Sequence, residues 1–136
     1  MIDFTFEQIN TFELDKILIS NWLSNVALSE NKNIETISVI FCSDDYLLSV
    51  NKEYLNHDYY TDIITFDYSV DTDISGDLFI SIDRVKENAT EFNVPFLNEL
   101  HRVLVHGVLH LCGYGDKSLD EETLMRSKED FYLLSI

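Results

Sequence analysis

The sequence has little proline and glycine, with one Pro and four Gly among 136 residues. Flexible linkers are usually rich in glycine, serine or proline, so no stretch of this chain divides it into two parts. The length suits one compact domain with a hydrophobic core and is too short for two ordinary domains. We find no internal repeat or low-complexity tract. We therefore expect residues 1–136 to form a single domain.

Cysteine and long apolar runs are also scarce. Cys42 and Cys112 are the only cysteines, and two isolated cysteines are typical of small buried side chains rather than of a disulfide framework. The longest apolar stretch runs from Val103 to Tyr114, contains two histidines and is too short to cross a membrane. No signal peptide is recognisable. We expect a cytoplasmic protein with no membrane partner.

Basic residues are few, since nine Lys and Arg oppose twenty-five Asp and Glu for a net charge of −16. Affinity for nucleic acid comes largely from cations that meet phosphates, so a chain this acidic is repelled by bare RNA at long range. Either its cations gather near one site or a protein partner delivers the substrate. Arg102, Lys117, Arg126 and Lys128 are candidates for such a basic rim. The acids between Glu99 and Asp130 equally favour a solvated surface of mixed charge.

The most informative stretch is residues 106–116, which read His-Gly-Val-Leu-His-Leu-Cys-Gly-Tyr-Gly-Asp. On a helix, His106 and His110 leave the same face one turn apart. Gly113 then ends the helix, and the chain can turn back to offer Asp116 as a third ligand. This spacing is that of a zinc site with two ligands on a helix and one after a glycine turn. Such a site leaves a coordination position for water, which indicates hydrolysis.

Other interpretations of these residues stay open at this point. The two histidines are also compatible with half-buried polar side chains, and Asp116 with a solvated loop residue. Asp120 and Asp73 are conceivable replacements for Asp116. Metalloproteases with this spacing have a glutamate after the first histidine as general base, and Gly107 stands there instead. The sequence therefore argues against a peptidase.

The sequence also predicts how four other residues lie relative to the metal. His57 lies in a loop and is better read as an ordinary loop histidine, while His101 should point away from the ligand face. Glu99 and Arg102 are plausible partners for the second nitrogen of each imidazole.

Hydrophobic patterns and caps predict four strands and five helices. The expected strands span residues 2–6, 34–41, 61–68 and 76–82, and the expected helices span 10–28, 44–55, 83–92, 95–113 and 118–134. The first helix should bury Leu14, Ile17, Leu18, Trp22 and Val26, and the last should cover the core with Leu124, Met125, Phe131 and Leu134. Residues 71–76 are expected to form a hairpin loop. We expect an α+β fold with a mixed sheet of about four strands, about five helices packed around it, and the metal site at the C-terminal end of a central helix.

Three motifs, in order, resemble those of the YbeY family of bacterial endoribonucleases and ribosomal-RNA maturation factors. His106 to Tyr114 is similar to the family hallmark H-G-x-L-H-L-x-G-Y-D-H. Upstream, residues 51–54 and 61–66 resemble N-x-x-Y-R and T-D-V-L-S-F, and residues 76–81 resemble G-D-I-x-I-S. Two positions depart from the pattern. The third histidine of the family aligns with Asp116, after Gly115 in place of an aspartate, and an arginine after the tyrosine aligns with Leu55.

The resemblance implies a zinc-dependent endoribonuclease with one ion per chain, held by His106, His110 and Asp116. It implies a role in ribosomal-RNA maturation at the 3′ end of the small-subunit RNA and in ribosome quality control. The expected partners are ribosomal RNA and ribosomal proteins or ribosome-associated factors, with no DNA. The catalytic base is not evident, and Asp62 and Asp77 are only weak candidates. The alternative is a ribosome-associated assembly factor in which the metal is structural and no catalysis occurs.

Overall fold

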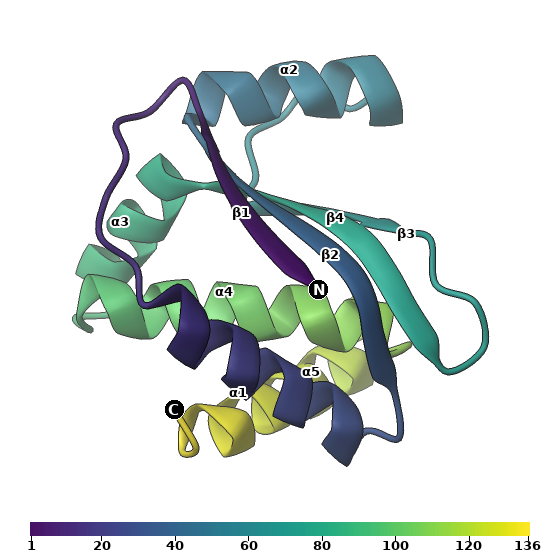
Figure 1. Cartoon of the computed structure of the whole chain (residues 1–136). Helices are drawn as coiled ribbons and strands as arrows, with labels where there is room; N and C mark the ends of the chain where they lie inside the picture. The colour runs from purple at the N-terminus through teal and green to yellow at the C-terminus, as the bar shows by residue number, and fades with distance from the viewer.

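The computed structural model describes all 136 residues as one α+β unit (Figure 1). In chain order the elements are β1 (Ile2–Glu7), α1 (Lys16–Ser29), β2 (Asn33–Cys42), α2 (Asp44–Leu55), β3 (Ile63–Asp67), β4 (Asp73–Ser81), α3 (Ile82–Glu91), α4 (Phe96–Leu111) and α5 (Leu119–Leu133). The predicted number of strands and helices is confirmed.

The four strands form a mixed sheet in the order β1-β2-β4-β3. β1 and β4 each pair with β2 in parallel, whereas β3 and β4 form an antiparallel hairpin. The hairpin loop is shorter than predicted, because Val70 and Asp73 exchange backbone hydrogen bonds and β4 begins at Asp73 rather than Gly76. β3 is therefore an edge strand with one free side.

Helices cover the two faces of the sheet unequally. Figure 1 shows α2 alone on one face and α1, α4 and α5 on the other. A main core of 22 buried residues fills the space on the second face, and alternate residues of β4, including Leu78 and Ile80, point into it. Under α2, a smaller cluster contains Cys42, Leu47, Val50 and Ile64. α4 is the central helix, since it contacts the sheet, α1, α3 and α5.

Two helices differ from their predicted boundaries or faces. α1 begins at Lys16, capped by Asp15, and the predicted capping box at Asn10 does not form. Trp22 and Val26 are buried as predicted, but Ile17 and Leu18 are 78% and 49% exposed. The residues that α1 buries are Ile19, Trp22, Leu23, Val26 and Ala27.

In α5 the capping box of Ser118 and Glu121 is confirmed, but only Met125 of the predicted apolar face is buried. Leu124, Phe131 and Leu134 are 49%, 64% and 85% exposed. The face that meets the core carries Met125, Glu129 and Tyr132 instead. The hydrophobic pattern could not reveal that this face contains a buried glutamate.

Neither cysteine forms a disulfide, as predicted. Cys42 lies fully buried beside β4, with its thiol 3.4 Å from the carbonyl oxygen of Ile80. Burial raises the pKa of this thiol to about 12, which leaves it protonated and unreactive at neutral pH. None of the five helices combines the length and apolar character needed to cross a lipid bilayer.

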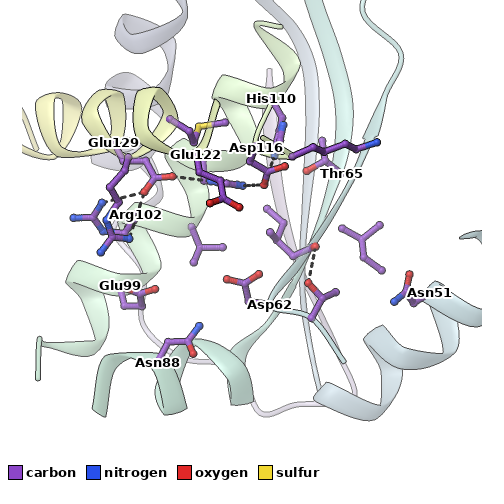
Figure 2. Close-up of a pocket in the computed structure, with 18 of the residues that line it drawn as sticks. Asn51, Asp62, Thr65, Asn88, Glu99, Arg102, His110, Asp116, Glu122 and Glu129 are labelled. Carbon is purple, nitrogen blue, oxygen red and sulfur yellow. Dashed lines mark hydrogen bonds and ion pairs between the residues drawn. The ribbon is translucent and has the colours of Figure 1, made fainter. Parts of the chain in front are cut away.

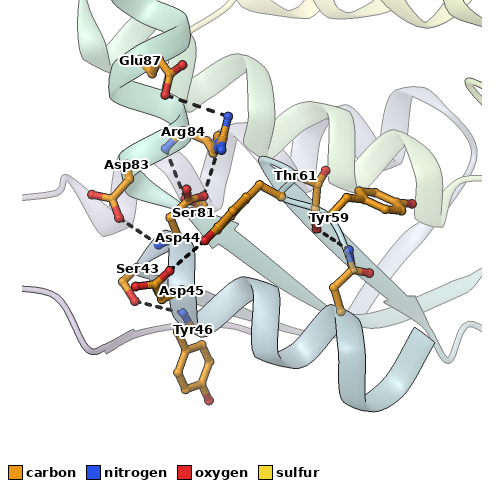
Figure 3. Close-up of polar contacts among 12 residues, drawn as sticks. Ser43, Asp44, Asp45, Tyr46, Tyr59, Thr61, Ser81, Asp83, Arg84 and Glu87 are labelled. Atoms are coloured by element: carbon orange, nitrogen blue, oxygen red, sulfur yellow. Dashed lines mark hydrogen bonds and ion pairs between the residues drawn. The ribbon is translucent and has the colours of Figure 1, made fainter. Parts of the chain in front are cut away.

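The first turns of α2 and α3 are tied together where β2 and β4 end (Figure 3). Ser43 and Ser81 cap the two helices. The carboxylate of Asp44 accepts hydrogen bonds from the Ser81 hydroxyl at 3.2 Å and from Arg84 Nε at 3.1 Å. Asp83 in turn accepts from the backbone N–H of Asp44 at 2.8 Å. These contacts fix the two helices whose C-terminal ends line the groove described next.

Candidate metal centre

The turn after α4 has the geometry that brings a distant ligand back to the helix. α4 ends at Leu111, and Gly113 follows with a φ of 108°. The Gly113 N–H donates to the His110 carbonyl at 3.0 Å, and the Tyr114 N–H donates to that of Leu109 at 3.1 Å. This pair of bonds is the Schellman arrangement, which glycine favours because it has no Cβ to clash at positive φ.

Three donor atoms converge at this turn. The Asp116 Oδ2 atom lies 3.3 Å from Nε2 of His106 and 3.3 Å from Nε2 of His110. One ligand atom from each of the three residues lies within 4.8 Å of the others, and no other group of histidine, cysteine and acidic side chains is so compact. A tetrahedral ion with bonds of about 2.0–2.1 Å keeps its ligand atoms about 3.3–3.4 Å apart. The group can therefore hold a metal ion.

The other nitrogen of each imidazole is held by the protein. His110 Nδ1 lies 2.8 Å from the Tyr114 carbonyl oxygen, and His106 Nδ1 lies 2.6 Å from Glu129 Oε2. A carbonyl oxygen only accepts, so His110 Nδ1 donates its hydrogen and leaves a lone pair on Nε2. Both rings thus present Nε2 to Asp116 in the form that binds a metal.

Glu129 is itself fixed by a cation. It is 4% exposed, and its Oε1 accepts from Arg102 Nη1 at 3.0 Å, while Arg102 Nη2 reaches Asp130 at 2.7 Å. Burial disfavours protonation of His106, but the hydrogen bond that His106 donates to Glu129 and the charges of Glu129, Asp116 and Asp62 outweigh it and raise the pKa of His106. The surrounding carboxylates therefore favour a cation at this imidazole.

The three donors open onto a groove of about 880 Å³ (Figure 2). Its lining comes from the C-terminal parts of α2 and α3, the free edge of β3, and α4 and α5. Asp62 lies in it just before β3, and burial raises the pKa of its carboxyl although His106 opposes the shift. Arg102, Lys117 and Arg126 are the cations that line it, against six acidic residues: Asp62, Asp67, Glu99, Asp116, Glu122 and Glu129.

Sequence comparisons show which protein family the chain belongs to. A sequence model described as Endoribonuclease YbeY matches residues 2–136. The chain belongs to the YbeY family. Proteins named Endoribonuclease YbeY from Flavobacterium psychrophilum and Phocaeicola vulgatus are 56% and 48% identical over 131 and 130 residues. These alignments cover 96% of this chain in both cases and 92% and 94% of the relatives. The predicted enzyme class, a hydrolase that acts on RNA, is thereby confirmed.

A solved structure supports the fold as well. The solution structure of a Thermotoga maritima protein superimposes with a TM-score of 0.69 at 29% identity, covering 98% of this chain and 87% of that one. The α+β fold predicted from the hydrophobic patterns and caps is therefore found in an experimentally determined structure.

Two predictions about the surroundings of the YbeY motif are wrong. Glu99 contacts neither imidazole, and Arg102 acts only through Glu129. Their place is taken by Glu129 and by the backbone carbonyl of Tyr114. Neither partner was predicted, because Glu129 lies 23 residues from His106 and a carbonyl leaves no mark in a sequence. The only feature of the sequence that could have indicated a buried Glu129 is that it shares a helix face with Met125.

The other residues considered for the site lie outside the group of three metal-binding donors. Asp73 and Asp120 are outside the compact group, and His101 packs against Trp22 with ring centroids 5.7 Å apart, facing away as predicted. His57 is an exposed loop residue at the rim, where its Nδ1 lies 3.0 Å from the Tyr59 hydroxyl. Asp77 accepts from the Tyr68 hydroxyl at 3.0 Å and does not line the groove.

Gly107 distinguishes this chain from metalloproteases, and Gly115 and Leu55 distinguish it from the YbeY pattern. Gly107, where metalloproteases carry a glutamate, packs against the sheet, and a Cβ there would lie 2.9 Å from Leu78 Cδ1. Gly115, where the family has aspartate, leaves the space that the Glu121 carboxylate occupies as it closes the α5 capping box. Leu55, at the position of the family arginine, lines the groove.

Proposed function

We propose that this protein is a zinc-dependent endoribonuclease that matures ribosomal RNA at the 3′ end of the small-subunit RNA and serves in ribosome quality control. The observation that carries the proposal is the convergence of His106, His110 and Asp116 on one side of an open groove. Two imidazoles and one carboxylate suit zinc and leave a position free for water. Such a substrate implies work in the cytoplasm, where ribosomes are assembled.

The protein holds the metal-binding imidazoles in position in the absence of substrate. A zinc ion held there would lower the pKa of a water molecule and offset the negative charge that develops on a phosphodiester. Glu129 and the Tyr114 carbonyl fix both imidazoles, so little reorganisation is needed. The open groove admits an RNA strand beside the free edge of β3.

Asp62 is the group in this groove that best suits a proton carrier. It is half-buried and within electrostatic reach of His106, and partial burial raises the pKa of its carboxyl. An acid whose pKa approaches the working pH can take a proton from an attacking nucleophile and later return it. Asp77, the other sequence candidate, does not line the groove.

The charge of the protein argues for a partner. The groove carries twice as many acids as cations, and Arg102 is already paired with Glu129 and Asp130. Binding to bare RNA through phosphates alone is therefore weak. The acidic surface complements basic ribosomal proteins, which would bring the enzyme to its RNA.

The test is cleavage of a ribosomal-RNA fragment by zinc-loaded protein, compared with His110→Ala. His101→Ala is the matched control, since it removes another histidine from α4 on the face away from the groove. We expect the wild type and the control to cleave and His110→Ala, folded by circular dichroism, to be inactive. Unfolding or lost ribosome association of His110→Ala, with no cleavage by the wild type, would instead support a non-catalytic assembly factor.

A further inference from the structure

Glu99 is a buried residue whose carboxylate reaches the groove and has no partner in the protein. It is 5% exposed, yet its carboxylate makes no hydrogen bond or ion pair, and it lines the groove. It lies seven residues before His106 on the same face of α4, which is about 10 Å along the helix. Glu99 therefore faces a part of the groove away from the three metal-binding donors, as Figure 2 shows.

Its surroundings disfavour the charged form of Glu99. Burial raises the pKa of Glu99, and the charge of Asp62 adds to the effect, while Arg102 and Arg126 only partly oppose it. Buried acids are normally paired with a donor or a cation. Because the Glu99 oxygens reach the groove and no protein group contacts them, they are free to accept hydrogen bonds from a ligand that enters it.

The acidic residues of this region are not arranged to bind a second metal ion. Glu99, Asp62 and Glu129 do not bring their oxygens within 4.8 Å of one another. Paired metal ions lie about 3.5–4 Å apart and share ligands, which this spacing does not allow. The partner is therefore a donor of hydrogen bonds rather than a cation of the active site.

The neighbours of Glu99 suit a flat, polar ring. Asn88 and Phe92, one turn apart near the end of α3, line the same part of the groove, and the Asn88 side chain is half-buried without a hydrogen bond. Phe92 is 51% exposed, and the guanidinium carbon of Arg126 lies 5.9 Å from its ring centre. Aromatic and arginine planes at the rim of a groove provide stacking surfaces for unpaired bases.

We infer that Glu99 recognises a guanine base of the RNA substrate, with Phe92 and Arg126 stacking on the base and Asn88 contacting its outer edge. This inference rests on the proposed function, because it names the base that the same groove selects. Glu99 then sets specificity at a nucleotide next to the one that is cleaved.

Guanine is the base that matches an ionised carboxylate. Its N1–H and N2–H₂ groups present two adjacent donors, and a carboxylate offers two acceptors side by side. Adenine and cytosine each place a ring acceptor beside the amino group, and uracil flanks its single N–H with two carbonyls. Each of these would set an acceptor against the Glu99 carboxylate.

A binding experiment tests the inference without catalysis. Metal-free, isotope-labelled protein is titrated with guanosine monophosphate or inosine monophosphate, which lacks the N2 amino group, and amide shifts are followed by NMR. We expect shifts at Asn88, Phe92 and Glu99, with guanosine binding at least about tenfold more tightly because a bond to a charged acceptor is lost with inosine. Glu99→Gln should remove this preference, and Glu91→Gln, an exposed acid outside the groove, should retain it.

Competition between two RNA substrates provides the second measurement. The zinc-loaded enzyme cleaves an equal mixture of RNAs that differ by one guanine-to-inosine change, and the ratio of kcat/KM values is followed. A wild-type preference for guanine that Glu99→Gln and Phe92→Ala abolish supports the inference. Equal binding of both nucleotides, no shifts in this region, or a preference that survives Glu99→Gln overturns it. Failure to cleave either RNA, with guanosine preference intact, contradicts the proposed function alone.

Discussion

The Nδ1 atom of His106 lies 2.6 Å from Oε2 of Glu129, a residue from another helix. The second oxygen of Glu129 accepts from Arg102 at 3.0 Å. This connection joins α4 to α5 through one imidazole, and it fixes the ring so that Nε2 faces Asp116. The orientation of the metal-binding donors is therefore a property of the packing between two helices.

Glu129→Gln should weaken metal binding without unfolding the protein. The amide keeps the size of the side chain but removes the negative charge that contacts both His106 and Arg102. Loss of a residue that hydrogen-bonds a metal-binding histidine typically lowers metal affinity by about 10-fold to 100-fold. Competition with a chromogenic zinc chelator measures the change. Asp130→Asn is the matched control, because it alters the exposed partner of the same arginine. Equal affinities for Glu129→Gln and the wild type would remove Glu129 from the site.

Glu30→Gln should destabilise the protein at neutral pH. Glu30 accepts from the hydroxyls of Tyr114 and Tyr132 and from Lys128 at 3.2 Å, and these bonds outweigh burial and lower its pKa. A lowered pKa in the folded state adds stability above the unfolded value of about 4.5 and loses it as the pH falls through the folded value. We expect a loss of about 1.5–3 kcal/mol at pH 7 in urea unfolding.

The same variant has a second consequence through Tyr114, whose carbonyl holds His110. Loosening its side chain should also lower zinc affinity. If Glu30→Gln unfolds like the wild type at pH 7, or loses as much stability at pH 3 as at pH 7, the account of this cluster is wrong.

Glu99→Gln should have the opposite effect on stability. Its pKa is raised in the folded state, mainly by burial, so the folded protein loses stability as the pH rises from about 4.5 through the raised value. Removing the charge should stabilise the protein at pH 7, and the gain should vanish at about pH 4. Thermal unfolding at the two pH values measures this, with Glu91→Gln as the exposed control. A destabilised Glu99→Gln at pH 7 would mean that the carboxylate has a partner within the protein.

Asp62→Asn tests the proton carrier. The amide cannot exchange a proton, so we expect kcat to fall by about 10²–10⁴-fold while zinc content stays at the wild-type level. The acidic limb of the pH–rate profile should disappear in the variant, since it reports the carboxyl of Asp62. A variant that retains both the rate and the acidic limb would exclude Asp62 from proton transfer.

Most of the fold could be predicted because its signals are local. The Ser118 capping box, the Ser43 cap and the glycine after α4 each act within a few residues, and each of the three elements forms where expected. α1 shows the limit of such signals. The predicted cap at Asn10 does not form, because the chain before Asp15 packs Phe12 and Leu14 against the core and the helix begins only after Asp15.

In the candidate site, too, the residues with local sequence signals could be predicted and those brought close by tertiary structure could not. His106, His110 and Asp116 follow from one helix and one turn, so their spacing predicts their convergence. The partners that orient them depend on α5 and on a backbone carbonyl, which only the tertiary structure brings near. Glu99 was predicted to be a partner of an imidazole, and its distance of about two helical turns from His106 explains why it does not reach that ring.

Elemental analysis of the purified protein, with and without Asp116→Ala, tests the central claim most directly. The account predicts about one zinc per chain in the wild type and a clear reduction in the variant, because three protein ligands are the usual number for an open zinc site. Absence of zinc from the wild type after incubation with zinc and dialysis, or equal zinc in both proteins, would contradict it.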